Sequence, residues 1–159
     1  MISLYTTLLV FGLMLAVFVI SGGYVAPSPL GGWLILLLEA LTVLSLTLLG
    51  SSLMSTLANG VMVFMLYGVA FVGSWTEQIG AVMDSRAAVD LGILSSLLMP
   101  SEALWRRAAY IMQEPLTRQL NASPFATFSV PSPAFIIYGL LYAVGLLALA
   151  ILAFSRRDF

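Results

Sequence analysis

Residues 133–154 read PAFIIYGLLYAVGLLALAILAF, a run of 22 amino acids that contains no charged side chain. A helix of about 20 mostly apolar residues is long enough to cross the hydrocarbon core of a bilayer. Proline at the start of the run is compatible with a helix, because the first turn does not need its backbone N–H. The stretch therefore predicts a transmembrane helix over residues 133–154.

Three further apolar runs precede this one, over residues 2–20, 32–50 and 57–75. A Ser-Gly-Gly turn ends the first run, and a pair of serines follows the second. Trp33 and Trp75 lie at ends of runs, where interfacial tryptophans are typical. The first run is not a signal peptide in our interpretation, because no positive charge precedes it. We therefore predict an all-α, polytopic membrane helix bundle with about four transmembrane helices.

The composition agrees with this class and excludes several functions. Hydrophobic residues make up 61% of the chain and charged residues only 8%, whereas soluble domains carry about 25% charged residues. Without histidine or cysteine the chain lacks the commonest general base and the thiolate metal ligands. The net charge of −1 gives no indication of a nucleic-acid partner. We expect no catalytic, cofactor or metal site in this chain.

Most charged residues fall in one stretch, residues 76–132, which we call the outer segment. Arg156 and Arg157 directly follow the last apolar run, and the positive-inside rule therefore places the C-terminus in the cytoplasm. Four spans return the N-terminus to the same side. The outer segment is then extracellular, as part of a single transmembrane domain over residues 1–159.

The outer segment is expected to contain short amphipathic helices. Ser101 is a favourable N-cap and Glu102 suits the positive end of a helix dipole. Glu102 and Arg106 are spaced for an i,i+4 ion pair, and Trp105 adds an amphipathic ring. Residues 77–98 also favour a helix, with a weaker apolar face. Such helices either cap the bundle or take part in substrate passage, and the sequence leaves both open.

Glu39 is a charged residue within the second apolar run. An acid at the centre of a span costs on the order of 3 kcal/mol on insertion scales. One interpretation is a carboxylate that faces a polar cavity or pairs across helices, as a transport-path residue. The other is a protonated or snorkelling carboxyl group that hydrogen-bonds to a neighbour such as Thr42.

Pairs of small residues four positions apart predict close helix approach. Ala70 and Ser74 form such a pair in the third run, and Gly139 and Ala143 form one in the fourth. These pairs support bundling of the spans.

The order of these features resembles the C-terminal part of ABC-2 type permeases, the membrane subunits of ABC exporters. The similar stretches are LTVLSLTLLGSSLMSTLANGVMVFMLYG (41–68), LLMPSEALWRRAAYIM (97–112) and LAFSRRDF (152–159). That family commonly has a Pro-Ser/Thr-acid-Ala-Leu-Trp-Arg element before its last span and a basic-basic-acid ending after it. These would be Pro100 to Arg106 and Arg156 to Asp158 in this sequence.

The resemblance implies a permease subunit in a prokaryotic inner membrane, with both termini cytoplasmic. It implies a separate ABC ATPase subunit and a second permease copy as partners, since this chain has no G-x-x-x-x-G-K-[ST] motif. Family members usually have six spans, so the chain resembles the last four, and two N-terminal spans would come from elsewhere. The alternative is a non-transport accessory or assembly subunit of the membrane.

Overall fold

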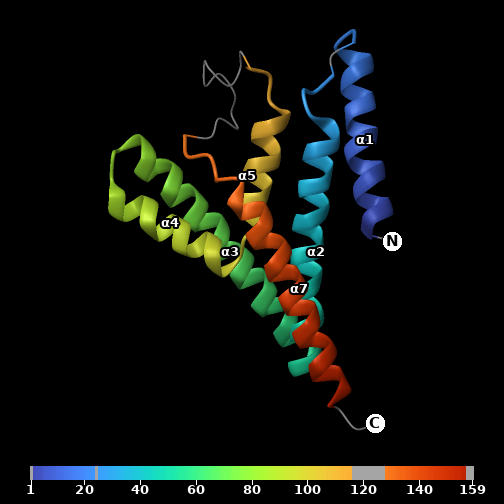
Figure 1. The fold of residues 1–159 in the computed structure, drawn as a ribbon, viewed down its shortest axis with the longest axis vertical. Coiled ribbons are helices and arrows are strands. Elements are labelled where there is room, and N and C mark those ends of the chain that lie inside the picture. The colour runs from blue at the N-terminus through green and yellow to red at the C-terminus, as the bar shows by residue number, and fades with distance from the viewer. Residues whose placement is uncertain (1, 24, 116–127, 157–159) are drawn as a thin grey trace.

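The computed structural model describes the chain except for residues 1, 24, 116–127 and 157–159 (Figure 1). Its described secondary structure is α-helical. The helices are α1 (Ile2–Ile20), α2 (Pro29–Leu53), α3 (Thr56–Val82), α4 (Arg86–Leu98), α5 (Ser101–Met112) and α7 (Ala134–Ser155). Part of the basic-basic-acid ending, Arg157 and Asp158, lies outside the described residues.

Three of these helices, α2, α3 and α7, are long and apolar enough to cross a membrane, with mean hydropathies of 2.1, 1.7 and 2.5. The pair α4 and α5 would make a fourth span or a re-entrant loop, and its two helices are bent by 105° at the break. Helix α1 is apolar as well, over Thr7–Ile20. The predicted helical class is therefore confirmed, with several helices that have the length and composition of membrane spans.

The turns between the first helices follow from the local sequence. Gly22 and Gly23 adopt φ values of 73° and 115°, which favour glycine, and Gly23 N donates to Phe18 O at the end of α1. Pro29 then opens α2, three residues before the start that the apolar pattern predicts. Asn59 of α3 closes the next turn by donating from Nδ2 to the carbonyl oxygen of Thr47, 2.9 Å away.

The bundle is built around α2. Both α5 and α7 pack along α2, whereas α4 folds back antiparallel beside α3 (Figure 1). The helices α4 and α5 form a V whose elbow, Met99-Pro100, is fully buried. The predicted outer segment therefore contains two helices that reach into the bundle and do not simply lie over its end.

Small residues set the closest helix contacts. Ala70, Ser74, Gly139 and Ala143 are all buried, which confirms the predicted packing positions. A Cβ on Gly139 would lie 3.0 Å from Leu104 Cδ1, so α7 and α5 approach each other closely there. Two apolar clusters lie beside these contacts. They contain Ile35, Leu38, Leu104 and Ala108 in one and Leu46, Ala70 and Met99 in the other.

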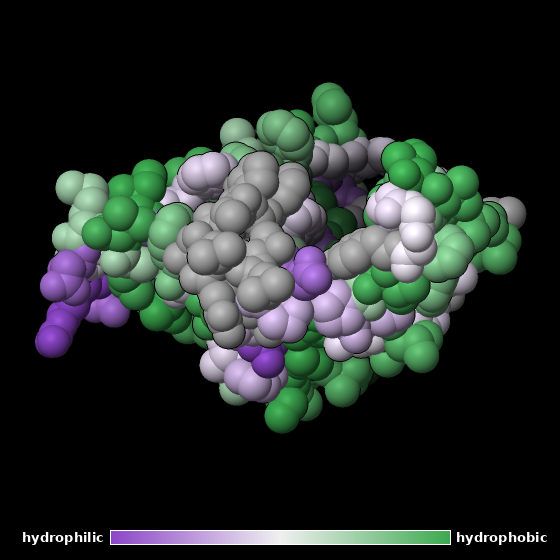
Figure 2. Space-filling model, turned by 90° about the horizontal axis from the view of Figure 1, so that it is seen from above, coloured by the Kyte–Doolittle hydropathy of each residue, from purple (hydrophilic) through white to green (hydrophobic). Residues whose placement is uncertain are grey.

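Seen from the end that carries the α1–α2 turn, hydrophobic residues surround the molecule and hydrophilic ones gather at the tip of the α3–α4 hairpin and near the centre (Figure 2). Apolar side chains facing outward are what hydrocarbon solvates and water does not. The surface therefore agrees with a bundle that lies in a bilayer.

Helix α3 continues beyond the predicted apolar run, which ends at Trp75, as far as Val82, and the carboxylate of Glu77 in this extension is paired with Arg106. The predicted start of α5 is wrong. Ser101 is not the N-cap of α5 but its first helical residue, and Pro100 occupies the N-cap position with a φ of −77°. Proline holds this φ by its ring and its carbonyl oxygen accepts from Leu104 N, so the helix starts one residue early.

Candidate functional site

A buried ion pair joins α3 to α5. Arg106 Nη2 donates to Glu77 Oε2 over 2.7 Å, and the two side chains are only 6% and 5% exposed. The predicted partner of Arg106 was Glu102, one helical turn earlier. The structure gives the direct ion pair to Glu77, whereas the charge of Arg106 acts on Glu102 only through its field. Glu77 receives the guanidinium because α4 and α5 fold back, bringing position 106 beside the end of α3.

The same two side chains fasten the segment that leads into α7. Ser129 Oγ donates to Glu77 Oε1 over 2.5 Å, and Arg106 Nη1 donates to the Ser129 carbonyl oxygen over 3.3 Å. Gln78 adds both a donor and an acceptor, since its Nε2 donates to Ser129 O and its Oε1 accepts from Phe128 N over 2.7 Å. Arg107 Nη1 donates to the carbonyl oxygen of Pro131. We call Glu77, Gln78, Arg106 and Ser129 the α3–α5 clamp.

The clamp connects three parts of the chain that are far apart in sequence. Both Glu77 carboxylate oxygens are bonded, so the acid is held as an acceptor for one guanidinium and one hydroxyl. Charge-assisted bonds of this kind are short and strong, and a buried pair that loses one member leaves an uncompensated charge. The end of α3, the middle of α5 and the start of α7 are therefore expected to move together unless this pair breaks.

A second polar group lies where α2, α3 and α5 meet. Glu39 and Glu102 lie within range for their charges to interact, and Tyr67 lies within the same electrostatic range of both acids. Ser74 of α3 lies within hydrogen-bonding reach of Glu102. The structure therefore brings Glu39 and Glu102 together, although they come from two segments that the sequence pattern treats separately.

Thr42 does not serve Glu39 as the predicted hydrogen-bond donor. Its Oγ1 donates to the carbonyl oxygen of Leu38 over 2.8 Å, and the residue is fully buried. Serine and threonine commonly donate to the carbonyl four residues earlier in a helix, because the hydroxyl then needs no other partner.

The remaining predicted residues of the outer segment, Ser101 and Trp105, differ in burial. Ser101 is completely buried at the start of the helix, and its Oγ has no hydrogen-bond partner. Trp105 is 36% exposed. Within the described residues no group of three or more His, Cys, Asp or Glu side chains is arranged to hold a metal ion.

Comparison with protein-family models, with curated proteins and with solved structures gives no match for this chain. The geometry of the helices and of the two polar groups therefore carries the functional argument.

The sequence contained only part of the clamp. Arg106 stands out within PSEALWRR, but Glu77 follows an apolar run without any local pattern that pairs it with a residue 29 positions later. A useful signal would have been the length of the apolar helix, because an acid that extends such a helix needs a buried cation. Gln78 and Ser129 carry no comparable signal.

Proposed function

We propose that this chain is the membrane permease subunit of an ABC-2 type export system. In this proposal it forms part of the substrate path and is powered by a separate ATPase subunit. The observation that carries the proposal is the bent pair α4–α5, whose elbow is buried and whose second helix begins within the PSEALWR element. This is the element through which the sequence resembles that family, and its Arg106 is half of the buried ion pair.

The bent pair supports transport for a physical reason. Backbone that breaks at membrane depth is tolerated where it is buried in protein or lines a polar path. The elbow between Met99 and Ser101 is buried, and the apolar cluster that contains Met99 draws its other members from α2, α3 and α7. Glu102 follows the elbow directly. A helix pair held only through side-chain contacts and the clamp has an arrangement that an energy source can shift.

The mechanism we propose is alternating access. ATP-driven closure of the ATPase subunits would move the long helices of two permease copies, and the α4–α5 pair would follow α3 through the clamp. The chain's own part is to hold the outer end of the path closed while Arg106 stays paired with Glu77. The proposed location is a prokaryotic inner membrane, with both termini cytoplasmic and the helices of the outer segment facing the other side.

A second candidate function is a non-transport accessory or assembly subunit. The broad apolar faces of α3 and α7 favour it, because only 11% and 17% of their most hydropathic windows are buried within the chain. Such faces fit against helices of other membrane proteins as well as against lipid. The two candidates differ in whether an ATPase subunit responds to this chain.

The test is reconstitution of ATP hydrolysis. The chain is co-expressed with each ABC ATPase subunit that the same genome encodes. The purified assemblies are placed in proteoliposomes. We expect one ATPase to co-purify and its hydrolysis to rise in the presence of the chain, whereas the chain alone neither binds nor hydrolyses ATP.

The variant Arg106→Gln tests whether the ion pair of the clamp couples the chain to ATP hydrolysis, and Arg86→Gln is its matched control. Arg86 is exposed at the tip of the α3–α4 hairpin, so its loss should leave the stimulation unchanged. Arg106→Gln should uncouple hydrolysis from the chain while the assembly still co-purifies. ATP-independent transport by the chain alone would favour a channel or carrier. Stable binding to an unrelated membrane enzyme, with no ATPase bound, would favour the accessory subunit.

A further inference from the structure

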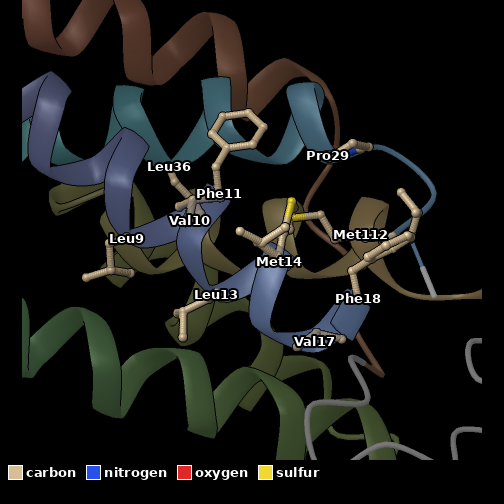
Figure 3. Close-up of a pocket in the computed structure, with 13 residues that line it drawn as sticks. Leu9, Val10, Phe11, Leu13, Met14, Val17, Phe18, Pro29, Leu36 and Met112 are labelled. Atoms are coloured by element: carbon tan, nitrogen blue, oxygen red, sulfur yellow. The ribbon is translucent and has the colours of Figure 1, made fainter. Parts of the chain in front are cut away.

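An apolar groove runs between α1 and the start of α2, and the end of α5 closes its floor (Figure 3). Its volume is about 640 Å³. Leucine, valine, phenylalanine and methionine make up most of its lining. The residues that matter most for the argument are Val10, Met14 and Phe18 of α1, Leu36 of α2 and Met112 of α5. None of the lining side chains is charged.

The groove exists because two neighbours approach α2 to different depths. Helix α5 comes very close, since a Cβ on Gly32 would lie only 2.0 Å from Met112 Sδ. Helix α1 stays further out and is fastened mainly through Val10, which is buried, and through Phe11, whose ring lies 6.1 Å from that of Trp33. The space between α1 and Met112 is therefore left open along one side.

The surroundings of the groove are apolar too. Outside the groove lining, α1 exposes Leu8, Val19 and Ile20, at 66%, 70% and 86%. In a chain whose long helices have the composition of membrane spans, such a surface lies in hydrocarbon. The groove continues this surface inward, so what fills it comes from the hydrocarbon and not from water.

The size of the groove selects the occupant. A helix with its side chains is about 10–12 Å across, so a volume of this size would hold only a stretch of about two turns or less. An unbranched hydrocarbon chain is much thinner and matches an uncharged lining. We propose that the groove binds one fatty-acyl chain of a bilayer phospholipid, which lies between α1 and α5 and completes the contact of α1 with the bundle. This site does not depend on the proposed transport function.

The test uses a phosphatidylcholine that carries a photoreactive diazirine in one acyl chain, in nanodiscs that contain the purified chain. Labelled positions are mapped by mass spectrometry. Met112 reports entry into the groove, and Ile151, which is exposed on α7, reports ordinary contact with the bilayer. We expect Met112 to be labelled at a level comparable to Ile151. Labelling of Ile151 without Met112 would overturn the proposal.

Filling the groove should expel the lipid. Met14→Trp places a bulky ring among the lining residues, and Leu8→Trp introduces the same ring on α1 outside the groove. We expect labelling of Met112 to fall by about tenfold in Met14→Trp and to stay unchanged in Leu8→Trp. Equal labelling in both variants would refute an acyl chain in the groove.

Two additional variants keep the test decisive. If Met14→Trp does not fold, Ala26→Phe fills the groove from the α1–α2 turn and should have the same effect. The competing occupant is a second copy of the chain. A Leu13→Cys variant that forms a disulfide-linked dimer in the nanodisc, with Met112 unlabelled, would assign the groove to that copy and overturn the lipid proposal.

Discussion

The contact between α3 and α4 depends on the absence of a side chain at Gly73. A Cβ at this position would lie 1.7 Å from Ser95 Oγ and 2.4 Å from Ser95 Cβ, far inside van der Waals distance. Overpacking of this kind costs about 1–3 kcal/mol, whereas alanine in place of glycine within a helix returns about 0.5–1 kcal/mol. We therefore expect Gly73→Ala to lower the free energy of unfolding by roughly 1–2 kcal/mol.

A second substitution tests whether the contact is the cause. Ser95→Gly removes both atoms that the new methyl group would meet and leaves only Ser95 Cα, at an ordinary 3.8 Å. The double variant adds a methyl group to α3 and removes a hydroxymethyl group from α4, so the helix preferences of the two changes partly cancel. The remaining loss is the hydrogen bond from Ser95 Oγ to Gly92 O, about 1 kcal/mol. The coupling between the two changes should be about 1–3 kcal/mol in favour of the double variant.

Gly68→Ala is the matched control on the same helix. A Cβ at Gly68 meets nothing within 4 Å, so this variant should be neutral or more stable by up to about 1 kcal/mol. The assay is unfolding in mixed micelles titrated with sodium dodecyl sulfate, followed by the circular dichroism of the helices. Equal effects of Gly68→Ala and Gly73→Ala, or no rescue by Ser95→Gly, would refute the packing of α4 on α3 at this position.

Three other predictions follow from the polar groups and the topology. Glu77→Gln should lower the free energy of unfolding by roughly 3–5 kcal/mol, because Arg106 then stays buried without its counter-ion. Adding Arg106→Met should recover most of that loss in the same micelle assay. Glu39→Gln should leave membrane insertion and gel-filtration behaviour intact, since removing a charge lowers the insertion cost. If Glu39→Gln aggregated whereas Glu39→Asp did not, Glu39 would instead be a structural ion-pair partner. A cysteine at Ala87, exposed near the start of α4, should react with an impermeant maleimide in intact cells, and one at Ser155 should react only after permeabilisation. The reverse pattern would contradict both the orientation and the exporter proposal.

The helices and their small-residue contacts could be predicted because both depend on local sequence. Helix α1 matches the predicted run over 2–20, since a Ser-Gly-Gly turn cannot continue the helix. Ala70 and Gly139 were recognisable from their spacing alone. The apolar run ends at Trp75, before the first charged residue, whereas helix α3 continues to Val82 with the charge of Glu77 paired to Arg106.

The partner choice could not be predicted, because it is set by the fold and not by spacing. Arg106 had a suitable acid at i−4, and such an exposed pair stabilises a helix by only about 0.3–0.5 kcal/mol. A buried guanidinium needs much more compensation than that, and Glu77 offers a carboxylate that is itself buried.

The bend at Met99-Pro100 allows Arg106 to pair with Glu77, since it turns α5 back toward the end of α3. The proline in PSEALWR is thus connected to the arginine that follows it. Proline starts the second arm of the V, and the arginine two turns later fastens that arm to α3. A substitution that straightens the elbow, such as Pro100→Ala, should therefore act on the ion pair as well as on the helix start. Its destabilisation should be smaller when Glu77→Gln has already removed the pair, and additive effects of the two changes would show that the elbow and the clamp are independent.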